Sequence, residues 1–489
     1  MALVEELADI VGSEYVSDEP EVLDAYSKDE SFVTPLKPRG IVKPRNADEA
    51  QAIVRWANHT ATPLIPVSSG PPHFRGDTVP SVGGTVIVDL SRMKRIISID
   101  RRNRVAIVEP GVTFTELLPD LAKEGLKLPI PLAPRSSKSV VASLLEREPI
   151  MIPKYGWQLA DPLRCTEIIW GNGDILMTGE AGSYNSLEQM WELRLAPVDP
   201  IGPEQVDYYR FVQAAQGSMG IVTWASVRCG VLPQLQKLFF VSSERLDVLL
   251  GFAYRLLKLR YADELLFLNG SNLANLLGQG ADESEALKEE LPQWVFIACV
   301  AGYDRLPKER VEFQEKDITD IAQQFGHRLM SAIPGATDRQ VLQILSGASR
   351  DPYWKLRYKG GYHDIFFLTT LNRTPEFIKA MCSVSEAAGY STSDIGIYIQ
   401  PLMQGVACHC EFVLPFEPGN RSEMSKVKKL VTEGSEALMK EGAFFSRPYG
   451  TWADMAYNKD PQTPIALKKI KGIFDPNNVM NPGKLCFRT

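Results

Sequence analysis

Apolar and polar positions follow two patterns of spacing in the first half of the chain. Apolar runs of strand length occupy residues 64–67 and 86–90, and Gly, Pro or polar residues bound each of them. Before the first run, Asn46 and Glu49 have the spacing of a helix capping box, and the apolar residues that follow, up to residue 57, repeat at helical spacing. The pattern predicts strands that alternate with helices.

From about residue 232 the pattern changes to longer strand-like runs with longer helical stretches between them. Two helices are predicted at residues 307–325 and 375–388, each with a proline at its start. Widely separated strands with helices between them indicate one sheet covered by helices. The predicted strands of this sheet occupy residues 238–241, 294–300, 366–370, 395–401 and 408–414.

Length and charge narrow the class of protein. A chain of 489 residues favours two or more domains. Its net charge of −7, with acidic and basic residues interspersed, gives no basic footprint for nucleic acid. No apolar run has the length of a membrane span, and the N-terminus is acidic where a signal peptide is basic. We therefore expect a cytoplasmic protein, with peripheral membrane attachment through a partner as the alternative.

Cysteine spacing excludes several kinds of site. The seven cysteines are scattered and include no Cys-x-x-Cys pair. This pattern argues against a disulfide scaffold and against a zinc or iron–sulfur site within the chain. Iron–sulfur clusters, if they take part, are expected on another subunit.

The most informative segment is the Gly- and Pro-rich loop between the first two apolar runs, residues 66–77. Glycine lets backbone N–H groups approach an anionic ligand closely. Three further segments follow in order, Glu109-Pro110-Gly111-Val112-Thr113, Gln216-Gly217-Ser218-Met219-Gly220-Ile221-Val222-Thr223 and Phe474-Asp475-Pro476 with Asn481-Pro482-Gly483-Lys484. The four segments in this order resemble the flavin-binding superfamily of vanillyl-alcohol oxidase and p-cresol methylhydroxylase, which also includes glycolate and D-lactate dehydrogenase flavoproteins.

The resemblance implies an α+β flavoprotein of two domains. An FAD-binding domain would span residues 1–231 and be completed by about 455–489, and an α+β cap domain with a helix-covered sheet would span 232–454. The active site would lie in the cleft between them, a usual place for a ligand pocket.

The resemblance also assigns FAD as the cofactor and suggests the residues that hold it. Those expected around the pyrophosphate are Ser68, Ser69, Gly70, Gly76 and Asp77. Those expected nearer the ring or its phosphates are Gly217, Ser218, Gly220, Val222, Asn481, Gly483 and Lys484. His73 is expected beside the cofactor. Some relatives bond a histidine of this loop covalently to the flavin, but alignment on Gly76 puts that position on Pro72.

One segment departs from the family pattern. Many members carry several glycines where this chain has residues 139–147. Ala142 and Ser143 are small, whereas Leu144 and Leu145 are not. A subunit that kept the fold and lost FAD therefore stays open.

Flavin chemistry needs few catalytic side chains, because the isoalloxazine itself accepts the hydride. On a strand, alternation places His409 and Glu411 on one face. His409 is the candidate base, and Glu411 could orient it. The pair could instead supply two metal ligands, but no third is evident and no metal site is predicted. A structural hydrogen bond is the remaining interpretation.

Further candidates are spread over the second half. Arg447 could clamp a carboxylate in bidentate fashion. Tyr449 and Tyr398 could stabilise a phenolate or alkoxide. His363, at the start of a predicted strand and beside Asp364, is another acid/base candidate.

These features predict an FAD-dependent oxidoreductase that takes a hydride from the alcohol carbon of a hydroxy acid. Electrons would pass to a protein or other acceptor, such as an iron–sulfur protein, a cytochrome or an electron-transfer flavoprotein. The alternatives are an oxidase or methylhydroxylase of para-substituted phenols and a flavin-free scaffold subunit. A closed pocket lined by tyrosines would favour the phenol branch, and an exposed arginine and histidine the hydroxy-acid branch. A homodimer is the commonest assembly.

Overall fold

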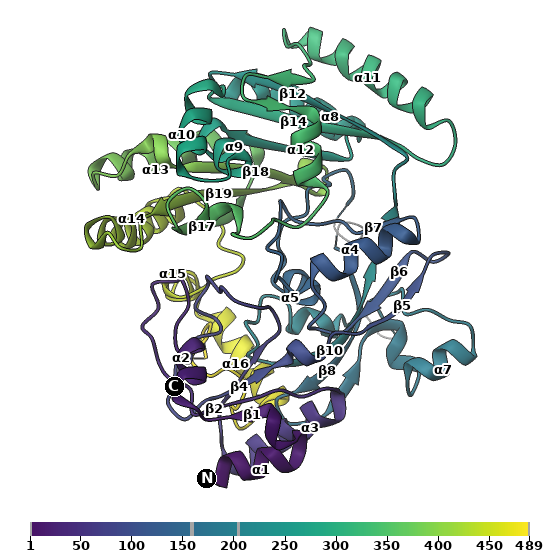
Figure 1. Cartoon of the computed structure of the whole chain (residues 1–489), viewed down its shortest axis with the longest axis vertical. Coiled ribbons are helices and arrows are strands. Elements are labelled where there is room, and N and C mark those ends of the chain that lie inside the picture. The colour runs from purple at the N-terminus through teal and green to yellow at the C-terminus, as the bar shows by residue number, and fades with distance from the viewer. Residues whose placement is uncertain (1, 157–160, 203–205, 488–489) are drawn as a thin grey trace.

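The computed structural model describes residues 2–156, 161–202 and 206–487. Figure 1 shows two bodies, one above the other. The purple N-terminal and yellow C-terminal segments lie together in the lower body, and the green segments form the upper one. Among the described residues, no helix is both long and apolar enough to cross a membrane.

The lower body contains a four-stranded sheet with the predicted helix beside it. The strand order is β1 (Val16–Ser17), β2 (Gly40–Val42), β4 (Val86–Asp89) and β3 (Leu64–Val67), and the last three are parallel. Helix α3 (Ala47–Thr60) buries its apolar face, and the Asn46 side chain caps it by accepting from the N–H of Glu49. The capping box is incomplete, because the Glu49 carboxylate accepts from the N–H of Arg45 instead of Asn46.

A five-stranded antiparallel sheet completes the lower body. The order is β5 (Ile96–Asp100), β6 (Val105–Val108), β10 (Gly220–Arg228), β8 (Leu163–Trp170) and β9 (Ile175–Met177). The helices around the two sheets are α1 (Ala2–Val11), α2 (Pro20–Ala25), α4 (Phe114–Lys123), α5 (Val140–Leu145) and α7 (Leu187–Glu192). Strand β7 (Leu126–Lys127) pairs with β11 (Gly230–Val231).

The C-terminal segment returns to these sheets. Helix α16 (Gln462–Phe474) ends beside β8, where the rings of Phe474 and Trp170 stack with centroids 4.0 Å apart. Seven residues further on, the N–H of Asn481 donates to the carbonyl of Leu64 on β3, at 2.7 Å. The chain therefore closes on the strand that leads into the Gly- and Pro-rich loop.

The upper body is built on one six-stranded antiparallel sheet, here called the cap sheet. Its order is β12 (Leu235–Ser243), β14 (Trp294–Gly302), β13 (Glu264–Asn269), β18 (Gly396–Leu402), β19 (Ala407–Phe416) and β17 (Gly361–Thr369). The expected helix-covered sheet is confirmed. The sequence reading missed β13.

Alternation along the strands divides the two faces of the cap sheet. Phe239 and Val241 of β12 belong to a core with the outer helices α8 (Asp247–Leu259), α11 (Pro307–Gln324), α13 (Thr374–Ala387) and α14 (Arg421–Lys440). Leu238 and Phe240 face the other way and join a core that extends into the five-stranded sheet. The cap sheet is therefore packed directly onto the lower body.

The remaining elements connect these layers. They are α9 (Gly270–Leu277), α10 (Ala281–Glu290), α12 (Asp338–Leu345), α15 (Thr451–Tyr457), and the short strands β15 (Ala332–Ile333) and β16 (Ala336–Thr337).

Candidate active site

A cavity of about 1610 Å³, its open mouth included, lies between the lower body and the cap sheet. Its loop end is formed by residues 66–69, 73–75, 77–78 and 134–135, and by Lys138. Its cap end is formed by Tyr353, Trp354, Lys355, Tyr362, Tyr398, Glu411, Arg447 and Tyr449. Residues of α5 and of the segment 212–222 line the space between the two ends.

Backbone and short side chains shape the loop end. The N–H of Gly70 donates to the carbonyl of Ser137 at 2.9 Å, and the N–H of Ser139 donates to Oγ of Ser69 at 3.1 Å. The Arg135 guanidinium donates to the carbonyl oxygens of Gly70 and Pro72. These bonds fix the loop against the segment that precedes α5 and bring a guanidinium to its side.

The C-terminal segment holds the same loop from behind. The Asn481 side-chain amide donates to the carbonyls of Asp77 and Gln216, at 2.9 and 2.7 Å. The Lys484 ammonium donates to the carbonyls of Gly76 and Val79, both at 2.7 Å. These two residues therefore position the loop without lining the cavity.

The predicted cofactor residues thus divide into two groups. Those that line the cavity are Ser68, Ser69, His73, Asp77, Gly217, Gly220 and Val222. Those that lie behind its wall are Gly70, Gly76, Ser218, Asn481, Gly483 and Lys484. Burial, reinforced by the positive charges of Arg135 and Lys138, lowers the pKa of His73 to about 3.

The loop end fits a dinucleotide. Two serine hydroxyls, the Arg135 guanidinium and the Lys138 ammonium supply hydrogen-bond donors and positive charge for a pyrophosphate. Apolar walls for the flat rings come from Leu90, Val141, Ala142, Met219 and Ile221. In the departing segment, Ala142 and Leu145 face this space, whereas Leu144 is packed in the core. The side chains that replace the family's glycines at residues 139–147 therefore leave the cavity open. This argues against a flavin-free scaffold.

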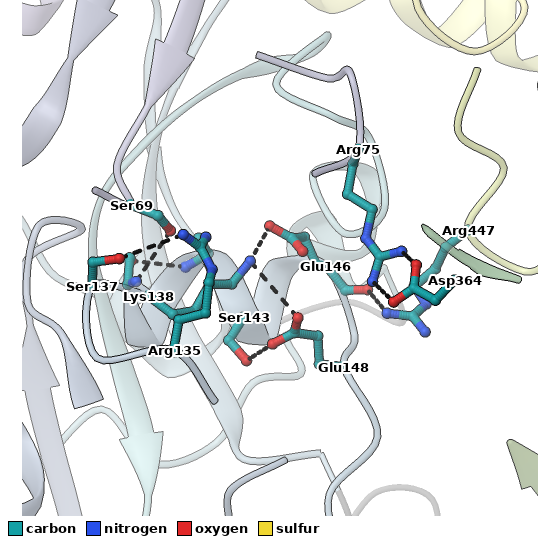
Figure 2. A network of polar contacts seen from close by, with 12 residues as sticks. Ser69, Arg75, Arg135, Ser137, Lys138, Ser143, Glu146, Glu148, Asp364 and Arg447 are labelled. Atoms are coloured by element: carbon teal, nitrogen blue, oxygen red, sulfur yellow. Dashed lines mark hydrogen bonds and ion pairs between the residues drawn. The ribbon is translucent and has the colours of Figure 1, made fainter. Parts of the chain in front are cut away.

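Two carboxylates gather around Lys138 in the middle of the cavity (Figure 2). The Lys138 Nζ lies 2.5 Å from Glu146 Oε1 and 3.8 Å from Glu148 Oε1, and the Ser143 hydroxyl donates to Glu148 at 2.5 Å. Burial raises the pKa of Glu146 and of nearby Asp77. Burial acts in the same direction on Glu148, but Lys138 and Ser143 hold its pKa below the usual value.

The cap end contains a chain of buried ion pairs. Arg75, from the loop, forms a two-pronged pair with Asp364 of β17. The Lys355 ammonium lies 3.1 Å from Asp364 and also pairs with Glu411 of β19. Although burial alone would raise the pKa of Glu411, Lys355 lowers it to about 2. Both carboxylates are therefore ionised at neutral pH.

The two candidate histidines do not line this cavity. His409 lies on the same face of β19 as Glu411, and its Nε2 is 3.2 Å from Glu411 Oε2. It is only 1% exposed, burial lowers its pKa, and it stands behind Glu411. His363 points to the other side of β17, where its ring stacks on Phe32 with centroids 5.1 Å apart.

Arg447 lines the cavity without a carboxylate partner. It is 5% exposed, and its guanidinium lies 4.1 Å from the centre of the Phe366 ring. Its recorded hydrogen bond goes to the backbone carbonyl of Glu146, at 3.4 Å, and no ion pair of the described residues includes it. Burial, together with the positive charge of Arg75, lowers its pKa. The charge is therefore available to an anionic ligand.

Four tyrosines line the cap end together with Arg447. The hydroxyl of Tyr398 donates to Gln400 at 2.9 Å. For Tyr353, Tyr362 and Tyr449, no hydrogen bond of the hydroxyl is found among the described residues, and all three rings line the cavity. The cap end therefore offers hydroxyl donors as well as positive charge.

Sequence reasoning missed Arg75, Lys355, Tyr353 and Tyr362. One signal could have found Tyr362: it alternates with Asp364 and Phe366 along β17, so the three share a face. Nothing in the local sequence indicates that Arg75 pairs with Asp364, 289 residues away, or that Lys355 pairs with Glu411, 56 residues away along the chain.

Two family models match parts of this chain. Residues 38–150 match the model of an FAD binding domain, and residues 410–485 match that of the C-terminal domain of FAD linked oxidases. The chain is an FAD-dependent oxidoreductase, similar to flavoproteins of the p-cresol methylhydroxylase type. FAD is its cofactor, and the loop end is the part of the cavity that fits it.

Relatives of this family match along nearly the whole chain. D-2-hydroxyglutarate dehydrogenase of Stutzerimonas stutzeri is 22% identical over 99% of this chain and 98% of its own length. Glycolate oxidase subunit GlcD of Bacillus subtilis is 25% identical over 98% of this chain and 96% of its own.

Solved structures share the fold. Substrate-bound p-cresol methylhydroxylase superposes with a TM-score of 0.82, at 20% identity, over 99% of this chain and 96% of that one. 4-Ethylphenol oxidase of Gulosibacter chungangensis gives 0.81 at 19% identity, over 99% and 97%.

Proposed function

We propose that this FAD-dependent oxidoreductase oxidises a para-substituted phenol. The main support is the cap end, where Arg447 and three tyrosines line one aromatic space. Among the described residues, no hydrogen bond of these three hydroxyls and no carboxylate paired with Arg447 is found. This environment fits a flat ring with an anionic oxygen better than it fits a small aliphatic acid.

The charge balance of the cap end supports a phenolate. Within the ion-pair chain and Arg447, three positive charges (Arg75, Lys355 and Arg447) meet two negative ones (Asp364 and Glu411), and the nearby Glu146 and Glu148 share the charge of Lys138. A nearby cation favours the ionised form of a phenol. Hydroxyl and guanidinium donors would then hold the phenolate oxygen.

A phenolate substrate also explains why neither His409 nor His363 faces the cavity. Bound FAD supplies the two-electron acceptor that takes the hydride. A phenol loses its proton before the hydride leaves, so the substrate needs stabilisation of its oxygen more than a base at the reacting carbon. Loss of hydride from the para-alkyl carbon then gives a neutral quinone methide, which water can attack. The role of Arg447 and Tyr449 in this proposal is to hold the oxygen.

Oxidation of a hydroxy acid is the second candidate. The planar guanidinium of Arg447 matches a carboxylate in bidentate geometry, and the relatives named above are a D-2-hydroxyglutarate dehydrogenase and a glycolate oxidase subunit. In this version Glu146, whose pKa burial raises, would be the cavity-facing proton acceptor, and His409 would act only through Glu411.

The proposed division of the chain follows the same geometry. The FAD-binding unit would comprise residues 1–231 and about 455–489, and the cap residues 232–454. A flavoprotein subunit of 4-cresol dehydrogenase from Pseudomonas putida is 28% identical over 39% of this chain. Its name supports a redox partner protein as the electron acceptor here.

Anaerobic reduction of the bound flavin tests the proposal. The FAD-loaded protein is mixed with 4-ethylphenol, or in parallel with glycolate, D-lactate or D-2-hydroxyglutarate, and the loss of visible flavin absorbance is followed. We expect bleaching by the phenol alone. Bleaching by a hydroxy acid alone would replace the phenol proposal by the second candidate, and bleaching by none would contradict both.

A further inference from the structure

A second cavity adjoins the cap end of the first. It encloses about 1260 Å³, its open mouth included, between the loop, helix α14 and the segment 449–453. Phe74, Arg75, Gln216 and Tyr449 line both cavities. A wall one side chain thick therefore separates the second cavity from the proposed substrate site.

The second cavity is lined by aromatic rings from three distant segments. His363 lies between Phe32, at 5.1 Å in a stacked arrangement, and Trp452, at 6.5 Å with the rings near perpendicular. Burial lowers the pKa of His363 to about 4, so its ring is neutral at physiological pH. These surfaces favour contact with a flat ring.

The charged residues that line this cavity are all positive. Its charged lining residues are Arg75 at the inner wall, Lys428 at the exposed mouth and Lys484, whose ammonium is bonded to the loop carbonyls. None of the described residues that line it is acidic, although the chain as a whole carries a net charge of −7. A basic cavity on an acidic protein concentrates anions.

The wall is the part that could admit a ligand. The Arg75 side chain is 18% exposed and is held by Asp364 on the cap sheet. Its guanidinium lies 4.3 Å from the centre of the Phe366 ring and 5.8 Å from that of Tyr449. Arg75 therefore belongs to the ion-pair chain of the cap end and at the same time faces the second cavity.

We propose that the second cavity is a binding site for an anionic, ring-bearing ligand, in which the substrate waits before it passes the wall of Arg75 and Tyr449. The ligand class rests on the proposed function, whereas the site rests on the aromatic and basic lining.

A titration with two readouts tests the site. The probe is 4-hydroxybenzoate, which carries a ring and an anion, added to the FAD-loaded protein. Trp452 emission, obtained by subtracting the signal of Trp452→Phe, reports on the second cavity, and flavin absorbance reports on the active site. We expect both signals, and we expect D-2-hydroxyglutarate, an anion without a ring, to leave Trp452 emission unchanged.

Substitutions in the second cavity give the decisive comparison. Thr432→Phe fills it, and Lys428→Glu reverses the charge at its mouth. Each should weaken the Trp452 response at least tenfold and slow the flavin response about tenfold. Lys429→Glu is the matched control, since Lys429 is on the same helix α14 and does not line the cavity. It should leave both responses unchanged.

The two proposals fail in distinguishable ways. If the Trp452 response is absent, or unchanged in both Thr432→Phe and Lys428→Glu, the second-cavity site is overturned. If that response behaves as expected but the flavin response is absent, the site stands and the phenol function fails. An equal response of Trp452 to D-2-hydroxyglutarate would overturn the ring-bearing ligand class.

Discussion

The loop end and the cap end of the cavity are built by opposite means. At the loop end, hydroxyls and backbone groups of one segment lie beside Arg135 and Lys138, and Asn481 and Lys484 hold that segment from behind. At the cap end, charged side chains from separate strands form a buried chain of ion pairs, beside which Arg447 lies without a carboxylate.

The difference separates recognition of the cofactor from recognition of the substrate. A fixed cofactor suits a site made of backbone and short side chains, because such groups lose little conformational entropy. A site for a reacting anion needs positive charge in a place with little water, where electrostatic interactions are strong. The ion pairs supply that charge without leaving a carboxylate unpaired.

The largest expected effect is on the ion-pair chain. Lys355→Met leaves Glu411 buried without its cation, and loss of one partner of a buried pair costs about 3–5 kcal/mol. We expect the free energy of unfolding in urea to fall by that amount. Lys308→Met, at an exposed pair on α11, should change it by no more than about 0.5 kcal/mol. Equal losses of unfolding free energy in both variants would show that the buried ion pairs of the cap end stabilise the fold no more than an exposed pair does.

The second effect separates the two ends by function. Arg447→Met removes a buried positive charge that we assign to the substrate, and loss of a charge-assisted hydrogen bond of this kind corresponds to about a hundred- to a thousandfold in kcat/KM. The affinity for FAD should be unchanged, and Arg447→Lys should restore part of the activity. A variant that loses FAD and keeps the rate constant of flavin reduction would reverse the assignment of the two ends.

The third effect is the acid sensitivity of the cap end. The pKa of Glu411 is lowered to about 2 in the folded state, below the roughly 4.3 of an unfolded chain. Its contribution to stability is therefore present above about pH 4.5 and is lost as the pH falls towards 2, by at most about 3 kcal/mol. The free energy of unfolding, measured between these pH values, should fall less in Glu411→Gln than in the native chain. An equal fall in both would contradict the pairing of Glu411 with Lys355.

The smallest effect concerns the loop end. Asn481→Ala removes two hydrogen bonds that hold the carbonyls of Asp77 and Gln216, and we expect about a tenfold loss in FAD affinity, near 1.4 kcal/mol. Asn477→Ala, which removes an exposed bond to Asn58, is the matched control and should bind FAD as the native chain does. Unchanged affinity in Asn481→Ala would show that the loop does not need this support.

Local patterns allowed the loop end to be predicted. Thr113 and Glu116 have the spacing of a capping box, and the structure contains the complete box at the start of α4. Two contiguous segments, the Gly- and Pro-rich loop and the C-terminal segment, have residue types that indicate a role in cofactor binding. The role of Asn481 behind the loop did not follow, because it depends on which carbonyls the fold brings within reach.

The cap end was harder because its parts meet only in the tertiary structure. Strand alternation correctly placed His409 and Glu411 on one face, but it could not tell which of them reaches the cavity. The roles of Lys355 and Arg75 depend on their ion pairs with Glu411 and Asp364, which follow 56 and 289 residues later in the chain. Such contacts are set by sheet register, which no local pattern in the sequence reports.

A crystal structure of the FAD-loaded protein with 4-hydroxybenzoate is the most direct test of a cavity with two functionally distinct ends. We expect the pyrophosphate against Ser68 and Ser69, and the phenol oxygen of the probe within hydrogen-bond distance of Arg447 and a tyrosine hydroxyl. FAD seated across the cap end, or a probe that leaves Arg447 without an anionic partner, would contradict this expectation.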